Sequence, residues 1–169
     1  MTQKVFGISG WKNSGKTTLT SAVIKELTAR GLRISSVKHA HHNVDVDQEG
    51  TDSFKHRISG ASEVMLASSK RFALMHEIGG SEEEWSLDQL LEKMSAVDLI
   101  LVEGFKSSNI PKIQTIRKAS LENEGMGQMN NIVAYAADMP IETYLPVLEI
   151  DDVVKVADFI IKYLNINVS

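Results

Sequence analysis

The chain has 169 residues, a length that suits one domain whose core is large enough to fold without disulfides. With 43% hydrophobic and 24% charged residues, its composition is that of an ordinary soluble globular protein. No apolar run approaches the roughly 20 residues of a membrane span, and the N-terminus lacks a signal-peptide pattern, so we expect a cytoplasmic protein with no membrane partner. The absence of cysteine excludes thiolate metal sites, and a net charge of −4 argues against a nucleic-acid partner.

A strand, a glycine loop and a helix open the chain in that order. Residues 4–9 are a short β-branched and apolar run typical of a strand, and residues 18–30 carry apolar side chains at helical spacing. Between them, residues 10–17 have the sequence GWKNSGKT, which fits the phosphate-binding pattern G-x-x-x-x-G-K-S/T in full. Because this pattern lies between a strand and a helix, we predict a nucleotide-binding loop.

The residue types of this loop suit a triphosphate. Gly10 and Gly15 permit backbone angles that turn successive amide N–H groups toward a phosphate, and the helix dipole favours the same negative charge. We expect the Lys16 ammonium to neutralise the β- and γ-phosphates and the Thr17 hydroxyl to ligate magnesium. Lys12 is expected to touch the phosphate of its own chain or to stay solvated. The predicted nucleotide-binding residues are Gly10, Lys12, Asn13, Ser14, Gly15, Lys16, Thr17 and Thr18.

A polar, histidine-rich segment follows the second predicted strand, residues 32–38. His39, His41 and His42, with two aspartates shortly after them, offer ligands for a transition metal. The same side chains could instead hydrogen-bond a phosphorylated substrate or a protein partner, or simply form a polar loop. We therefore name these three histidines as candidate substrate or partner contacts, with metal binding as the alternative.

The next elements are a short helix, residues 52–59, and a hairpin made of strands 62–67 and 72–77. Asp52 opens the helix, where it is either the N-cap or a candidate catalytic residue that reaches the magnesium or its water. Arg57, on the same helix, is a candidate contact for a substrate or partner.

A capped helix and a buried strand introduce the second candidate magnesium ligand. Ser86 and Gln89 have capping-box spacing at the start of a predicted helix, residues 86–94. Residues 97–102 form a nearly continuous apolar run, as in a strand buried on both faces. Glu103 directly follows this run, at the carboxyl end where open α/β sheets bind ligands, so we predict that it holds magnesium. Asp98 should lie about 15 Å away, given ~3.3 Å per strand residue, and is expected to be a turn residue.

The last part of the chain adds strands at residues 112–116, 132–136 and 147–150 and a C-terminal helix after Asp152. Residues 117–131 are polar and glycine-bearing and predict an irregular excursion. This order of elements predicts an α/β three-layer sandwich, a P-loop NTPase with a mostly parallel central sheet plus a β-hairpin extension. We expect one such nucleotide-binding domain over residues 1–169. No N-K-x-D guanine-reading motif is present, and Ala136-Ala137-Asp138 after a strand is a weak substitute.

Four segments together resemble one family. The loop GWKNSGKTTL, the stretch VKHAHHNVDVDQEGTDSFKHRISGA, the strand end LILVEGFK and the later PKIQTIR are similar, in this order, to the molybdopterin-guanine dinucleotide biosynthesis protein B (MobB) family. The resemblance covers residues 5–117. It implies a homodimeric GTP-binding accessory protein with slow GTP hydrolysis, which assists the guanylyltransferase that attaches GMP to molybdopterin. It also implies GTP and Mg²⁺ as cofactors, with Thr17 and Glu103 near the metal, and molybdopterin as a further candidate ligand. Thr51 stands where relatives often carry lysine.

Two other functions stay open. A small-metabolite kinase would need a base and an arginine-bearing lid, for which Asp52 and Arg57 are candidates, although the chain has no clear lid insertion. A GTP-dependent metallochaperone would deliver an ion through the segment from His39 to His42. Proteins of that type generally pair histidine with cysteine, which this chain lacks.

Overall fold

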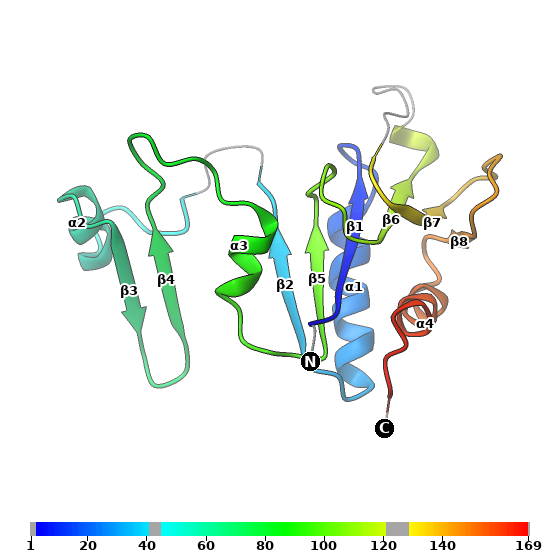
Figure 1. Ribbon diagram of the computed structural model, residues 1–169, viewed down its shortest axis with the longest axis horizontal. Helices are drawn as coiled ribbons and strands as arrows, with labels where there is room; N and C mark the ends of the chain where they lie inside the picture. The colour runs from blue at the N-terminus through cyan, green and yellow to red at the C-terminus, as the bar shows by residue number, and fades with distance from the viewer. Residues whose placement is uncertain (1–2, 41–44, 121–128, 169) are drawn as a thin grey trace. The chain divides into compact units, whose positions relative to one another are not determined.

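The computed structural model describes residues 3–40, 45–120 and 129–168 (Figure 1). The chain divides into two compact units. The sheet unit comprises residues 1–39 and 94–169, and the hairpin unit comprises residues 40–93. In the described part of the chain, no helix is long and apolar enough to cross a membrane. The expectation of one domain over residues 1–169 stays a prediction.

Six strands form the central sheet of the sheet unit. In spatial order they are β2 (Ile34–Lys38), β5 (Leu99–Glu103), β1 (Val5–Gly10), β6 (Lys112–Ile116), β7 (Ile132–Ala137) and β8 (Val147–Glu149). Each strand pairs in parallel with its neighbours. Their carboxyl ends therefore lie at one edge of the sheet, and the glycine loop leaves that edge from a central strand, β1 (Figure 1).

Helices α1 (Lys16–Ala29) and α4 (Val153–Leu164) pack on one face of this sheet. Alternate side chains of the strands point toward them, as the two-residue period of a strand requires. The shared core includes Phe6, Ile8, Leu19, Val23, Leu27, Leu101, Val156 and Ile160. The predicted C-terminal helix is confirmed, and its Val156 and Ile160 lie in this core. The predicted α/β class with a parallel sheet, flanking helices and a hairpin is confirmed as well.

The hairpin unit contains two short helices and one hairpin. Its elements are α2 (Asp52–Ile58), β3 (Glu63–Ala67), β4 (Phe72–His76) and α3 (Leu87–Glu92). Strands β3 and β4 pair antiparallel, as predicted. The capping box also forms: Ser86 accepts a hydrogen bond from the Gln89 amide, and the Gln89 side chain accepts one from the Ser86 amide.

The chain is irregular just before β5 and just after β6. Asp98 lies before β5, where its Oδ2 accepts a hydrogen bond from the Arg33 amide at 2.7 Å, so the predicted turn residue is confirmed. Burial of the strand begins at Leu99 and continues through Glu103. The predicted excursion after β6 starts with a short 3₁₀ turn, η1 (Lys118–Ser120), while residues 121–128 lie outside the description.

Candidate functional site

Gly10 and Gly15 determine the path of the loop between β1 and α1. Gly15 is the N-cap of α1 and has a φ of 86°, in the left-handed region that favours glycine. A Cβ at Gly10 would lie 2.2 Å from Thr115 Oγ1, so a larger residue cannot fit without displacing β6. No described side chain caps the first turn of α1, so none competes with an anion for the N–H groups there.

Ser14 and Lys16 fold back onto the loop itself. The Lys16 ammonium donates to the Trp11 carbonyl at 2.5 Å, which places its charge over the loop. The Ser14 hydroxyl donates to the same carbonyl at 2.8 Å and contacts Thr115 Oγ1 at 2.7 Å, which ties the loop to β6. Lys12, Asn13 and Thr18, the remaining predicted nucleotide contacts, are exposed around the loop. The predicted phosphate residues thus form one continuous turn at the head of α1.

The two predicted magnesium ligands meet at the carboxyl edge of the sheet. Thr17 Oγ1 donates to Glu103 Oε1 at 2.7 Å, across 86 residues of sequence. The strand register explains this contact, because Glu103 is paired with Ile8 near the end of β1. Glu103 is buried, and a hydroxyl beside a buried carboxylate is a set of hard oxygen ligands that suits magnesium. Asp98 lies at the other end of β5.

Lys38 joins this pair and was not predicted from the sequence. Its ammonium lies 3.3 Å from Glu103 Oε1 and 3.4 Å from Thr17 Oγ1. The position between the two oxygens therefore already accepts a positive charge, which is what a magnesium site requires. The signal in the sequence is indirect: Lys38 is the last residue of β2, and only the pairing of β2 with β5 brings it opposite Glu103.

The segment after Glu103 folds against the glycine loop and against His39. Lys106 Nζ lies 3.6 Å from the centre of the Trp11 ring, an arrangement typical of a cation–π contact. Phe105 has a φ of 47° and stacks on His39, with ring centroids 4.6 Å apart. Of the three histidines named from the sequence, His39 is therefore placed at the sheet edge. His41 and His42 lie outside the described residues.

A buried lysine fixes the start of β6. Lys112 is fully buried, and its ammonium donates to the carbonyls of Ser108, Ile110 and Asn130. Burial lowers the pKa of Lys112 below its ordinary value. The three carbonyls belong to the connections before β6 and β7, so this side chain orders the segment that follows Glu103.

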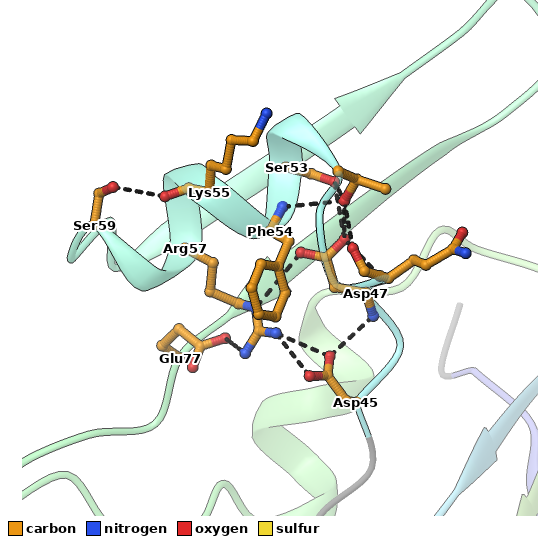
Figure 2. Close-up of polar contacts among 10 residues, drawn as sticks. Asp45, Asp47, Ser53, Phe54, Lys55, Arg57, Ser59 and Glu77 are labelled. Carbon is orange, nitrogen blue, oxygen red and sulfur yellow. Dashed lines mark hydrogen bonds and ion pairs between the residues drawn. The ribbon is translucent and has the colours of Figure 1, made fainter.

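Arg57 is held by carboxylates within the hairpin unit, as Figure 2 shows. Its Nη2 pairs with both oxygens of Asp45, at 2.8 and 3.0 Å, and its Nη1 lies 3.8 Å from Glu77 Oε1. These contacts, above all that with Asp45, raise the pKa of Arg57. The guanidinium predicted to contact a substrate or partner is thus engaged by side chains of its own unit.

Asp47 anchors the same cluster (Figure 2). Its Oδ1 accepts hydrogen bonds from the Ser53 hydroxyl at 2.8 Å and the Gln48 amide at 3.1 Å, and its Oδ2 lies 3.5 Å from Arg57 Nε. Burial alone would raise the pKa of Asp47, but the hydrogen bonds from Ser53, Gln48, Thr51 and Arg57 together hold it below its ordinary value. This nearly inaccessible carboxylate therefore stays charged and fastens the segment before α2 to the helix.

The N-cap of α2 is Thr51, so the N-cap role considered for Asp52 is wrong. Thr51 Oγ1 accepts a hydrogen bond from the amide of Phe54, the third residue of the helix. The Thr51 hydroxyl, one residue before Asp52, has the right spacing to cap this helix. Asp52 is exposed and pairs with Lys55 at 3.0 Å. Its reach to magnesium stays a prediction.

The described residues contain no group of three or more His, Asp or Glu side chains arranged to hold a metal ion. The sites that the structure does assemble are the glycine loop with Thr17, Lys38 and Glu103 in the sheet unit, and the Arg57 cluster in the hairpin unit.

The chain is similar to proteins whose names refer to molybdopterin-guanine dinucleotide synthesis. The family described as "Molybdopterin guanine dinucleotide synthesis protein B" (MobB) matches residues 5–138. The chain is 40% identical to the molybdopterin-guanine dinucleotide biosynthesis adapter protein of Escherichia coli (strain K12), over 95% of this chain and 93% of that protein. The protein of the same name from Haemophilus influenzae is 39% identical, over 95% and 89%.

Two crystal structures superpose on nearly the whole chain. One, of molybdopterin-guanine biosynthesis protein B, has a TM-score of 0.72 at 30% identity and covers 95% of this chain and 99% of its own. Another, of Bacillus subtilis MobB, has a TM-score of 0.74 at 25% identity and covers 95% and 98%.

Proposed function

The chain belongs to the molybdopterin guanine dinucleotide synthesis protein B (MobB) family, and we propose that it acts in the cytoplasm as a GTP- and magnesium-binding adapter with weak GTP hydrolysis. The observation that carries this proposal is the 2.7 Å contact between Thr17 and Glu103 at the head of α1. This contact supports a magnesium position directly beside the phosphate-binding loop.

The loop supplies most of the binding energy in this proposal. The N–H groups at the start of α1 bind the phosphate oxygens, and the Lys16 ammonium moves from the Trp11 carbonyl onto the β- and γ-phosphates. Thr17 and Glu103 would hold the magnesium, which would supply positive charge to neutralise the same phosphates.

The side chain next to the proposed magnesium ligands supports the weak hydrolysis in this proposal. In the described part of the sheet unit, Lys38 contacts both Thr17 and Glu103. The Lys38 ammonium is a cation and cannot take a proton from an attacking water. An efficient GTPase also needs a residue that orients this water. In this proposal the chain acts as a nucleotide-controlled binding protein.

The partner in this proposal is the guanylyltransferase that attaches GMP to molybdopterin. Support comes from the relatives, which are described as adapter proteins of molybdopterin-guanine dinucleotide biosynthesis. GTP is a substrate in such a reaction, so an adapter that holds GTP fits beside an enzyme that consumes it. Molybdopterin itself is the further candidate ligand.

A second copy of the chain is the proposed partner of the hairpin. Phe72, Met65 and Leu66 are 71%, 61% and 57% exposed, and Leu74 on the same hairpin is 47% exposed. A two-stranded hairpin with exposed apolar side chains and unpaired edges is unstable in water unless another surface covers it. Pairing with the same hairpin of a second copy covers both at once, which supports a homodimer.

The test of the proposed site is a calorimetric titration with GTP, with and without Mg²⁺. Replacing Glu103 by Gln removes the charge but keeps the shape, and removing one such charged contact is worth about 1.5–3 kcal/mol, or roughly a 10- to 100-fold loss of affinity. We expect Glu103→Gln to show this loss only when Mg²⁺ is present. The matched control is Asp98→Asn, at the opposite end of the same strand. Wild-type, Mg²⁺-dependent affinity in Glu103→Gln would contradict the assignment.

The same titration with a second variant tests whether the glycine loop binds the phosphates. Lys16→Ala should abolish measurable GTP binding, because the β- and γ-phosphates lose their neutralising cation. Lys25→Ala removes an exposed lysine from the same helix and should bind like the wild type. Retained affinity in Lys16→Ala would rule out the loop as the triphosphate site.

A further inference from the structure

Lys106 is a half-buried cation beside the glycine loop that has no carboxylate partner in the described part of the chain. Its Nζ lies 3.6 Å from the centre of the Trp11 ring, and this cation–π contact holds the ammonium in place. By contrast, Lys38 at the same sheet edge is paired with Glu103. An ammonium on an aromatic face keeps its charge, so Lys106 can offer that charge to an anion.

Trp11 brings the Lys106 ammonium close to that of Lys16. The Lys16 ammonium donates to the Trp11 carbonyl at 2.5 Å, while the Lys106 ammonium lies over the ring of the same residue. The loop therefore meets two ammonium groups, one from α1 and one from the segment between β5 and β6. Like charges at such close quarters repel each other, and an anion that pairs with both relieves the repulsion.

A tight turn brings Lys106 from the end of β5 to the loop. Gly104 and Phe105 have φ angles of 92° and 47°, both in the left-handed region. A positive φ is uncommon for a bulky residue and persists only where the surrounding contacts hold it. Here the Phe105 ring stacks on His39, with ring centroids 4.6 Å apart. Lys106 thus leaves the sheet three residues after Glu103, the acid proposed to hold magnesium.

Three residues fix the backbone of the segment that carries Lys106. Every carbonyl from residue 106 to residue 110 accepts a hydrogen bond from Asn130, Asn131 or Lys112. The Asn130 amide and Nδ2 donate to the first two, at 3.3 and 2.9 Å, and Asn131 Nδ2 donates to the carbonyl of residue 109 at 2.9 Å. The buried Lys112 ammonium donates to the remaining two. Only the side chain of Lys106 then has to move to reach a ligand.

The position of Lys106 suits the terminal phosphate of a nucleotide. In loops of this kind, the loop lysine and the metal both serve the β- and γ-phosphates. Lys106 contacts the residue that holds Lys16, and it follows the proposed magnesium ligand Glu103. A nucleoside diphosphate has no γ-phosphate, so a further cation at this end distinguishes a triphosphate from a diphosphate.

We propose, building on the nucleotide binding proposed above, that Lys106 pairs with the terminal phosphate and makes the chain prefer a nucleoside triphosphate to a diphosphate. On binding, its ammonium exchanges the Trp11 ring for phosphate oxygens. Asn130, Asn131 and Lys112 are positioning residues, because they hold the backbone from which Lys106 extends.

The experiment compares GTP and GDP, each with Mg²⁺, by calorimetric titration. Lys106→Met keeps most of the length of the side chain and removes its charge, and the loss of one charged contact corresponds to about 10- to 100-fold in affinity. We expect this loss for GTP and wild-type affinity for GDP. Lys106→Arg should restore the preference for GTP, because a guanidinium also stacks on aromatic rings and binds phosphate. The matched control is Lys93→Met, which removes the ammonium 4.9 Å from the Trp85 ring in the hairpin unit and should leave both affinities unchanged.

A second variant tests the positioning residues. Asn130→Ala removes the side-chain hydrogen bond to the carbonyl of residue 107. We expect a smaller loss for GTP than in Lys106→Met and none for GDP. Added to Lys106→Met, the same substitution should cause no further loss, because both act through one ammonium. Losses that add in the double variant would overturn the positioning role.

The fluorescence of Trp11 provides a readout that is independent of affinity. The chain has two tryptophans, Trp11 and Trp85, so Trp85→Phe leaves Trp11 as the single reporter. We expect saturating GTP to shift its emission more than saturating GDP does, because only GTP takes the ammonium from the ring. With Lys106→Met added, the two nucleotides should give the same shift. A difference between GTP and GDP that survives Lys106→Met would overturn the proposal.

The titration separates failure of this proposal from failure of the proposed function. A wild type that binds GTP and GDP equally, or a Lys106→Met variant that loses both equally, would overturn the role of Lys106 and leave the phosphate site intact. A wild type that binds neither nucleotide would overturn the proposed function itself.

Discussion

At the scale of single residues, the charges of Glu103 and Arg57 are each compensated by neighbouring polar or charged groups. Glu103 is buried yet flanked by the Lys38 ammonium and the Thr17 hydroxyl, so its charge is compensated at the place where a nucleotide's magnesium is proposed. In the hairpin unit, Arg57 is compensated in the same way by Asp45, Asp47 and Glu77. Thr17 and Glu103 present oxygen atoms at the sheet edge, where they can bind a ligand. The ion pairs of Arg57 instead connect segments within the hairpin unit.

His76 gives the hairpin unit a dependence on pH. Its Nδ1 lies 2.8 Å from Glu63 and its Nε2 lies 3.0 Å from Glu82, and these two contacts raise the pKa of His76. A raised folded-state pKa stabilises the folded chain fully below the unfolded value of about 6.5, and this contribution is lost as the pH rises through the folded-state pKa. We expect His76→Gln to be less stable than the wild type at about pH 5.5 and to differ less at about pH 9.

Urea unfolding at the two pH values measures this difference between wild type and variant. His56→Gln, which replaces an exposed histidine on α2, serves as the control for loss of an imidazole. A stability difference for His76→Gln that is the same at both pH values would show that the two glutamates do not favour the protonated ring.

Single residues also show what local spacing can and cannot predict. The sequence predicts Glu103 as a magnesium ligand because an acid directly after an apolar run lies at the ligand-binding edge of a parallel sheet. The sequence does not predict the positions of three other residues near the loop, Lys38, Lys106 and Arg117. Each of them contacts a residue that is distant in sequence, so its position depends on the tertiary structure. Asp52 was considered as a cap because it is a good capping residue, but the hydroxyl of Thr51 has the correct position in this helix.

At the scale of elements, the glycine loop is fastened to β6 as well as to β1. A Cβ at Gly10 would lie 2.2 Å from Thr115 Oγ1 and 2.4 Å from Ser14 Oγ, which already hydrogen-bond to each other. We expect Gly10→Ala to separate them, to destabilise the chain by about 1–3 kcal/mol as overpacked cores do, and to weaken GTP binding. Thermal unfolding and GTP titration measure the two effects.

Gly79→Ala is the matched control for this substitution. A Cβ at Gly79 would meet no atom within 4 Å, so the variant should keep the wild-type unfolding temperature. If Gly10→Ala were as stable as Gly79→Ala, the loop would not be packed against β6 in the way described.

The strands and helices themselves were predicted closely, because their signals are local. Periods of two and 3.6 residues, the capping box at Ser86 and the glycine loop between β1 and α1 are all properties of neighbouring residues. The strand limits differ from prediction by one or two residues, as for β5, which begins at Leu99 after the turn at Asp98. The order of strands across the sheet has no such local signal, since it depends on pairing between distant segments.

At the scale of the whole molecule, the exposed hairpin makes association the expected state. Phe72 is the most exposed of its large apolar side chains, at 71%, so a charge there should disrupt a surface shared by two copies. We expect the wild type to be a dimer and Phe72→Glu to be a monomer with an unchanged circular dichroism spectrum. Size-exclusion chromatography with light scattering measures the mass of both.

The control for this charge is Ser69→Glu, in the exposed turn between β3 and β4, which should stay dimeric. A monomeric wild type, or a dimeric Phe72→Glu, would contradict the proposed role of the hairpin in association.

The sequence by itself determined the fold class, the glycine loop between the first strand and the first helix, the acid at the end of β5 and the family, because these depend on periodicity and motif spacing along the chain. Only the tertiary structure decided which of the polar residues meet. β5 lies between β2 and β1 in the sheet, so Glu103 at its end contacts both Lys38 and Thr17. The parallel ends of β6, β7 and β8 likewise bring Arg117, Asp138 and Asp151 together. Such contacts arise from strand pairing between segments far apart in sequence, where no local pattern records the partner.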